Sequence, residues 1–149
     1  MTAARKSVDA NLDFQDNMVA LVRALGLHKP DQTSCGQPVS VGEAHALMEV
    51  AREPGITQNG LVQRLRLEKS TVSRIAGLLE LRGWIARERD PDDTRYVRLR
   101  LTASGRKSNA TIAAAHAAKF AKVFEALPKA QRADVIAAVS ALVEVLREN

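Results

Sequence analysis

The sequence predicts a mainly α-helical fold that carries one small β-hairpin. Aromatic residues make up only 3% of the chain, whereas alanine, leucine and valine are frequent, which favours helix-on-helix packing over a sheet sandwich. Several stretches place apolar residues three and four positions apart, as on the buried face of a helix. By contrast, residues 96–101 alternate polar and apolar side chains, the period of a half-buried strand.

The first two helices are expected at residues 9–27 and 41–52. The first carries Leu12, Met18, Leu21, Val22 and Leu25 at helical spacing, and a glycine follows them as a stop signal. The segment 28–40 is polar and holds two prolines and a glycine, which indicates a loop. Ser40 is placed to cap the second helix, and "EPG" ends it.

A helix-turn-helix unit is predicted next. Thr57 can cap a short helix over residues 58–65, and four residues separate that helix from another at 70–83, which ends at a glycine. The second helix of the pair has a core-facing stripe, with apolar residues at i, i+3, i+4 and i+7. These residues are Val72, Ile75, Ala76 and Leu79.

The other face of this second helix has the chemistry of base recognition. It carries Ser70, Thr71, Ser73 and Arg74 in its first turns. Short hydroxyl side chains permit close approach to a groove, and an arginine can donate two hydrogen bonds to guanine. We therefore predict that these four residues contact DNA.

A β-hairpin and two further helices complete the chain. Residues 84–90 and 95–101 flank a Pro-Asp-Asp-Thr loop, and a hairpin that follows a helix-turn-helix makes a winged helix. Thr102 is placed to cap a long helix over residues 103–126, with Ile112, Phe120, Val123 and Phe124 at core spacing. Pro128 ends that helix, and the last helix has Val135, Val139, Leu142 and Leu146 along one seam.

The positive charge is concentrated in the middle of the chain. Residues 57–107 hold twelve Lys and Arg against six Asp and Glu, so this third of the chain has a formal charge of +6. The remainder has a formal charge of −1, which gives the total of +5. A basic region this localised is typical of nucleic-acid binding.

Together the wing and the recognition helix resemble the MarR family of bacterial transcription regulators. The hairpin reads Asp93-x-Arg95, then five residues, then Leu101-Thr102-x-x-Gly105, which is similar to the family's wing signature, and residues 67–87 are similar to its recognition helix and the exit from it. The resemblance implies a winged helix-turn-helix with a helical dimerisation lobe formed by the N- and C-terminal helices. It assigns residues 1–149 to one domain, with DNA binding at 41–101 and dimerisation at 9–27 and 103–147.

The resemblance also implies a partner and site residues. We expect a homodimer that binds a palindromic operator in double-stranded DNA, with Arg95 in the minor groove and Asp93 bracing the wing. The alternative is that Arg95 only forms a salt bridge with Asp93 and holds the shape of the loop. Asp90 and Asp92 are interpreted as turn formers. The further candidates for DNA contact are Lys69, Gln58, Asn59, Arg89 and Arg98.

Two positions depart from the family pattern. Gly77 and Leu78 stand where many relatives carry an acid and an arginine, which puts one phosphate contact in doubt. Gly77 also costs about 1 kcal/mol of helix propensity relative to alanine.

No enzyme, cofactor or metal site is predicted. The sequence has no Gly-rich phosphate loop, no nucleophile elbow and no paired carboxylates, and its three histidines are scattered. We expect a cytoplasmic protein without membrane association. We also expect a repressor rather than an activator. The resemblance implies that a small phenolic or lipophilic effector releases it from DNA. Two alternatives stay open: a winged helix that binds protein instead of DNA, and a redox-responsive regulator that uses the single cysteine, Cys35.

Overall fold

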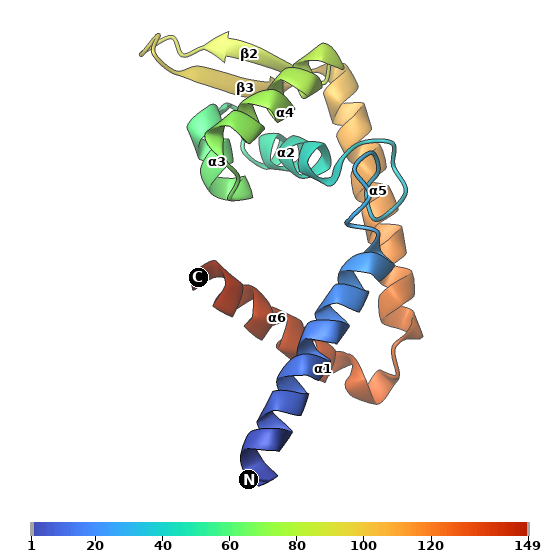
Figure 1. Ribbon diagram of the computed structural model, residues 1–149. Coiled ribbons are helices and arrows are strands. Elements are labelled where there is room, and N and C mark those ends of the chain that lie inside the picture. The colour runs from blue at the N-terminus through green and yellow to red at the C-terminus, as the bar shows by residue number, and fades with distance from the viewer. Residues whose placement is uncertain (1, 149) are drawn as a thin grey trace. The chain divides into compact units, whose positions relative to one another are not determined.

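The computed structural model describes residues 2–148, with side chains from residue 9 onward, so the two end residues of the predicted domain lie outside it. It shows the predicted mainly helical fold with a small antiparallel sheet (Figure 1). The elements are α1 (Thr2–Leu25), α2 (Val41–Arg52), β1 (Ile56–Thr57), α3 (Gln58–Leu65), α4 (Lys69–Leu81), β2 (Ile85–Arg89), β3 (Val97–Leu101), α5 (Ala103–Ala126), the 3-10 turn η1 (Lys129–Gln131) and α6 (Arg132–Glu148). The chain divides into two compact units, which meet within α5 after Ala113.

Helix boundaries follow the sequence closely where a capping residue marks them. Ser40 accepts a hydrogen bond from the Glu43 N–H at 3.1 Å, and the Glu43 carboxylate accepts one from the Ser40 N–H, so α2 begins with a capping box. Thr57 caps α3 by accepting from the Gly60 N–H. The first helix begins before the predicted 9–27, because it extends N-terminal to the apolar stripe on which that prediction rested. It ends at Leu25 instead of residue 27, because Gly26 takes a positive φ of 71°.

The sheet has three strands rather than two. β1 pairs with β3 as an edge strand, which makes the order β1-β3-β2, and Ile56 lies opposite Leu99. The sequence did not predict β1, since two residues are too few to show a period. β2 and β3 form the hairpin that projects beyond α4 in Figure 1, as expected for the wing.

The core of the first unit lies between α2, α3, α4 and the sheet. Leu47, Leu61 and Leu99 are fully buried, one from each of α2, α3 and β3. The predicted stripe of α4 is confirmed, because Val72, Ile75, Ala76 and Leu79 are all buried in this core. This packing turns the polar side of α4 toward solvent.

A charged pair ties the start of α2 to the end of α4. Glu43 is only 6% exposed, and its carboxylate accepts hydrogen bonds from the Ser40 hydroxyl at 2.8 Å and from Arg82 Nε at 2.9 Å. Burial disfavours the charged carboxylate, but the hydrogen bonds from Ser40 and Arg82 outweigh it and lower the pKa of Glu43. The Arg82 guanidinium also lies over the Trp84 ring, 5.0 Å from its centroid.

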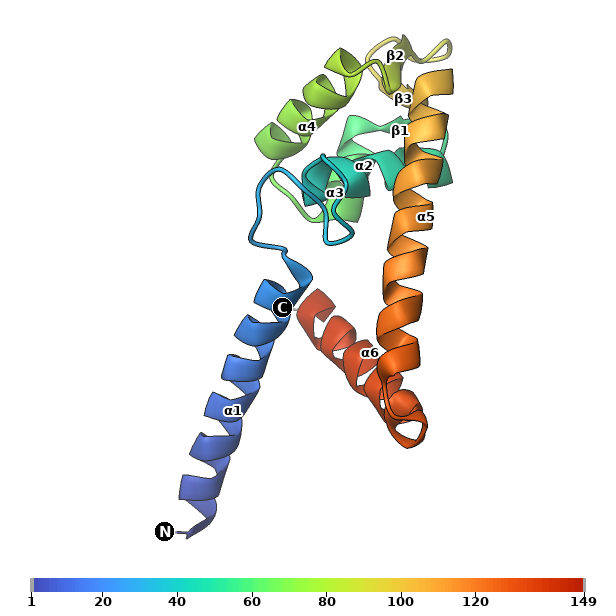
Figure 2. The same cartoon turned by 90° about the vertical axis from the view of Figure 1, so that its right-hand side faces the viewer.

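A tight joint links the wing to α5. Thr102 donates from its N–H to the Trp84 carbonyl at 3.0 Å and from its hydroxyl to the Gly83 carbonyl at 2.6 Å, while its hydroxyl caps α5 by accepting from the Gly105 N–H. An ideal Cβ at Gly105 would lie 1.8 Å from the Trp84 oxygen. The Leu-Thr-x-x-Gly motif is therefore a packing joint, and Figure 2 shows α5 leaving β3 directly from it.

The second unit contains the rest of α5, η1 and α6. Arg132 closes the turn by donating to the carbonyls of Glu125 and Leu127, and its guanidinium lies 5.2 Å from the centroid of the Phe124 ring. Ile112 of α5 is buried in the first unit, but Phe120, Val123 and Phe124 are exposed in the single chain, so their helical spacing did not indicate an intramolecular core. The apolar seam of α6 is likewise exposed at Val139 and Leu146.

Two glycine-to-alanine substitutions should have opposite effects on stability. Gly77→Ala should raise the free energy of unfolding by roughly 0.5–1 kcal/mol, because Gly77 lies inside α4 and a Cβ there meets no atom within 4 Å. Gly105→Ala should lower it by about 1–3 kcal/mol, because the added Cβ collides with the Trp84 carbonyl and forces the backbone to shift. Urea titration of both variants measures the difference, and each glycine is the control for the other. A gain of stability in Gly105→Ala would contradict the close approach.

Candidate nucleic-acid interface

The first turns of α4 present the predicted recognition residues to solvent. Ser70, Ser73 and Arg74 are exposed and Thr71 is half-buried, on the side of the helix away from the core stripe. Glu68 occupies the N-cap position but makes no side-chain capping hydrogen bond. The first N–H groups of α4 are therefore left uncapped by that side chain, and such groups favour an anionic oxygen.

Four of the predicted contact residues line one hollow between α3, α4 and the wing. The hollow has a volume of about 200 Å³. The predicted residues in its wall are Gln58, Asn59, Lys69 and Arg95, and Thr57, Arg87, Tyr96 and Val97 complete it. The fold thus brings Gln58 and Arg95, 37 positions apart in the sequence, to one surface. Lys69, Arg87 and Arg95 make this surface basic.

At the wing tip, Asp93 holds Arg95 directly. The Arg95 guanidinium donates to the two carboxylate oxygens at 3.0 Å from Nε and 2.8 Å from Nη2, and the Arg95 N–H donates to Oδ1 at 3.1 Å. These hydrogen bonds lower the pKa of Asp93. The Arg95 side chain remains 85% exposed, so the pair fixes one edge of the guanidinium and leaves the other toward solvent.

Asp90 forms a turn, as its interpretation as a turn former expected, but the sequence did not indicate that it is buried and bonded to Arg98. It is 7% exposed and accepts hydrogen bonds from the N–H groups of Asp92 at 2.8 Å and Asp93 at 3.2 Å, and from Arg98 Nε at 2.6 Å. The backbone N–H of Asp92 and the Arg98 guanidinium lower its pKa. The Asp-x-Asp-Asp spacing signals an Asx turn, but nothing in it signals burial.

Arg98 is engaged within the fold. Besides its bond to Asp90 it donates to the Gly55 carbonyl at 3.1 Å, so it joins the wing to the turn before β1. Its predicted phosphate contact therefore stays a prediction and competes with this structural role. Arg87, on β2, likewise donates to Glu80 at 2.9 Å and to Gln58 at 3.4 Å.

Arg74 and Arg89 are exposed, and the structure records no ion pair for either of them among the described residues. The same described part of the chain shows no cluster of His, Cys, Asp or Glu suited to a metal ion. None of its helices combines the length and apolar content that a membrane span requires.

The comparisons with known proteins agree with this fold. Residues 37–95 match the model of the MarR family, which confirms the resemblance for the winged-helix lobe. No curated protein sequence matches the chain.

Solved structures share the fold over nearly the whole chain. FabT of Streptococcus pneumoniae in complex with DNA is 22% identical, with 97% of this chain and 98% of that chain covered and a TM-score of 0.70. MepR of S. aureus in complex with DNA is 22% identical, with 89% and 97% covered and a TM-score of 0.73. BpsR of Bordetella bronchiseptica is 18% identical, with 87% and 91% covered and a TM-score of 0.69.

Replacing Asp90 by asparagine should loosen the wing without unfolding the core. Asparagine keeps an acceptor for the Asp92 N–H but loses the charge that faces Arg98, so amides of residues 92–96 should exchange faster with solvent. The depressed pKa means that the native carboxylate stabilises the wing above the ordinary aspartate pKa and loses this effect as the pH falls through the lowered value. The difference between wild type and variant should therefore shrink in acid. Asp92→Asn, at an exposed position, is the control, and equal exchange in both variants would contradict the role of Asp90.

Proposed function

The chain carries the winged helix of the MarR family of DNA-binding transcription regulators, and we propose that it binds an inverted-repeat operator as a homodimer and represses transcription. The observation that carries the proposal is the basic hollow in which Gln58, Asn59, Lys69 and Arg95 converge beside the exposed first turns of α4. The structures of FabT and MepR with DNA support it, since those proteins share this fold.

In this proposal α4 enters the major groove. The hydroxyls of Ser70 and Ser73 allow close approach, and Arg74 reaches a guanine edge. Lys69 and the N–H groups at the start of α4 bind phosphate, as do the side chains at the start of α3. The residues around the hollow thus hold the helix in register while Arg74 reads sequence.

The wing reaches the adjacent minor groove. Arg95 is presented by Asp93, so less side-chain entropy is lost when the guanidinium enters a narrow groove than for an unrestrained arginine. Asp93 neutralises part of the positive charge of the Arg95 guanidinium, but it also fixes the direction in which that guanidinium points.

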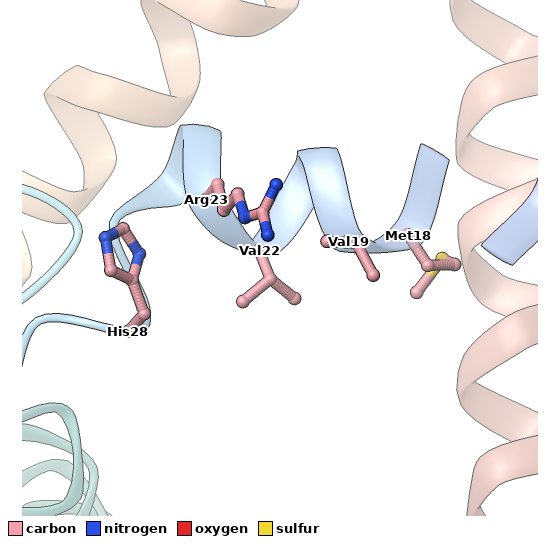
Figure 3. A pocket seen from close by; sticks show the side chains of 5 residues that line it. All are labelled: Met18, Val19, Val22, Arg23 and His28. Carbon is pink, nitrogen blue, oxygen red and sulfur yellow. The ribbon is translucent and has the colours of Figure 1, made fainter. Parts of the chain in front are cut away.

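A homodimer accounts for the apolar residues that the single chain leaves exposed. They lie on α1, α5 and α6, and Figure 3 shows two of them, Val19 and Val22, on α1 beside the half-buried Met18. The most exposed are Leu12, Phe14, Leu21, Phe120, Val123, Ile136, Val139, Val145 and Leu146. Soluble monomers rarely leave so many large apolar side chains uncovered, so we infer that a second copy covers them.

We further propose that a small effector releases the DNA. Support comes from BpsR, whose DNA binding is regulated by 6-hydroxynicotinic acid. An effector shifts the equilibrium only by its difference in affinity for the DNA-binding and released conformations. Repression follows if the operator overlaps a promoter.

A protein-binding winged helix is the second candidate. Leu81 at the end of α4 is 85% exposed and Leu78 is 36% exposed, which gives this helix an apolar end that DNA would not contact. The three cationic side chains of the hollow, Lys69, Arg87 and Arg95, favour DNA over a protein partner.

Selection of DNA from a random pool tests the proposal. The full chain should enrich an inverted repeat with half-sites about one helical turn apart, and affinity for it should fall by roughly three orders of magnitude between about 50 and 200 mM salt if six or more phosphates are contacted. Enrichment of single, unpaired half-sites would contradict the homodimer. No enrichment with weak salt dependence would favour the protein-binding candidate.

Two arginine variants separate the roles of helix and wing. Arg95→Ala should weaken operator binding by roughly tenfold or more while melting is unchanged, because its guanidinium is exposed and supports no part of the core. Arg74→Ala should cost about 1–3 kcal/mol per half-site on the operator and little on random DNA. Arg64→Ala is the control, because the Arg64 guanidinium pairs with Glu49 and Glu53 and Arg64 does not line the hollow. Equal losses on both DNAs would reassign Arg74 to a phosphate.

A further inference from the structure

Arg87 joins three elements of the winged helix at the hollow that it lines. On β2 it lies opposite Leu99 of β3, and Leu99 lies opposite Ile56 of β1, so the three residues form one row across the sheet. Gln58, the first residue of α3, follows two positions after Ile56. Neighbouring strands lie about 4.8 Å apart, so the Arg87 side chain has only β3 to cross before it meets the start of α3.

The Arg87 guanidinium is held on two sides. Its Nε donates to the Glu80 carboxylate of α4 at 2.9 Å, and its Nη1 donates to the Oε1 atom of Gln58 at 3.4 Å. The ion pair with Glu80 balances the charge of Arg87 and restrains its side chain. The Arg87 side chain is 31% exposed, whereas that of Arg95 is 85% exposed. Arg87 is therefore much less available to DNA than Arg95 is.

The bond from Arg87 decides which end of the Gln58 carboxamide is used within the fold. A glutamine carboxamide has an acceptor oxygen at one end and an NH₂ group with two donors at the other. A guanidinium carries donors alone, so it binds Gln58 only through Oε1. Nε2 then keeps two N–H groups, for which the structure records no hydrogen bond among the described residues.

These two N–H groups suit a phosphate oxygen. Gln58 is half-buried and lines the hollow together with Asn59 and Lys69, which carry further donors. In protein–DNA complexes, half or more of the hydrogen bonds go to phosphate and sugar, and glutamine side chains are among the donors. An unrestrained carboxamide can turn its oxygen toward a phosphate, and two acceptors repel each other. A carboxamide that is held by its oxygen avoids this loss.

We propose that Arg87 is a positioning residue for DNA binding. It holds the Gln58 carboxamide by its oxygen, so that the Nε2 N–H groups are presented to a phosphate of the operator, and Glu80 holds Arg87 in turn. Arg87 thus acts through Gln58 and not as a cation on the DNA. The inference deepens the proposed function and rests on it, because it requires that the start of α3 meets the DNA backbone.

The contact is tested first without DNA, by NMR of the Gln58 side-chain amide in the full chain. Arg87→Met keeps the aliphatic stem and removes the donors, so it should shift the two Nε2 proton resonances. Because the ion pair with Glu80 is partly exposed, the variant should still fold, which thermal melting checks. Unchanged Gln58 resonances in Arg87→Met would overturn the contact.

Arg100→Met is the matched control for every measurement. Arg100 donates to Glu88 at 3.0 Å on the same pair of strands, but it does not line the hollow. Its substitution should leave the Gln58 resonances and the operator affinity as they are in the wild type. Losses in Arg100→Met that equal those in Arg87→Met would show a general effect of weakening the hairpin and would refute the specific role of Arg87.

Operator affinity is measured next for Arg87→Met, Gln58→Ala and the double variant, on the inverted repeat obtained by selection. Each single substitution should weaken binding roughly threefold to tenfold per half-site, as expected for the loss of one hydrogen bond. The double variant should bind no more weakly than Arg87→Met alone, because Gln58 contributes only while Arg87 holds it. Additive losses, or unchanged affinity in Arg87→Met, would contradict the proposal.

The salt dependence separates positioning from a direct phosphate contact. Arg87→Met should leave the slope of log affinity against log salt concentration unchanged, because Glu80 already balances the charge of Arg87. A slope that falls by about 1 per half-site would assign Arg87 itself to a phosphate.

The conservative variant Arg87→Lys tests the geometry of the contact. It should bind the operator as weakly as Arg87→Met, since an ammonium group keeps the charge but lacks the fork that reaches both Glu80 and Gln58. Wild-type affinity in Arg87→Lys would mean that charge alone matters, against the positioning role.

Operator binding by the wild type distinguishes the two ways of failing. A wild-type chain that binds no operator at any salt concentration would overturn the proposed function, and the role of Arg87 on DNA would fall with it. A wild-type chain that binds the operator no better than Arg87→Met does would overturn the role of Arg87 alone.

Discussion

The close approach of the first turn of α5 to the Trp84 carbonyl is the constraint on which the rest of the lobe depends. β2 begins directly after Trp84 and β3 ends directly before Thr102, so both strands of the wing are anchored at this one point. Thr102 satisfies the Gly83 and Trp84 carbonyls, and Gly105 permits the contact by having no Cβ. The joint therefore fixes the point at which both strands of the wing leave the core.

The acidic residues of the wing serve this same geometry at its other end. Asp90 is buried under the loop and bonded to Arg98, and Asp93 is bonded to Arg95, so two of the three carboxylates are used within the wing. A charge count treats them as opposing DNA binding. Their positions show that they organise the loop and orient the one arginine that stays 85% exposed.

The sequence by itself determined the helices with clear caps, the exposed polar face of α4 and the position of the wing, because capping and periodicity depend on residues within one or two turns. The helices at 41–52, 58–65 and 103–126 were predicted with the boundaries the structure has. Tertiary structure alone decided the pairing of Ile56 with Leu99 and the bond from Arg98 to Gly55, because each joins residues that are far apart in the sequence. It also decided the burial of Asp90, because no local sequence pattern encodes how deeply a side chain is buried. The same limit explains Phe120 and Val123: helical spacing shows that a face is apolar, but only the folded molecule shows whether its own chain covers that face.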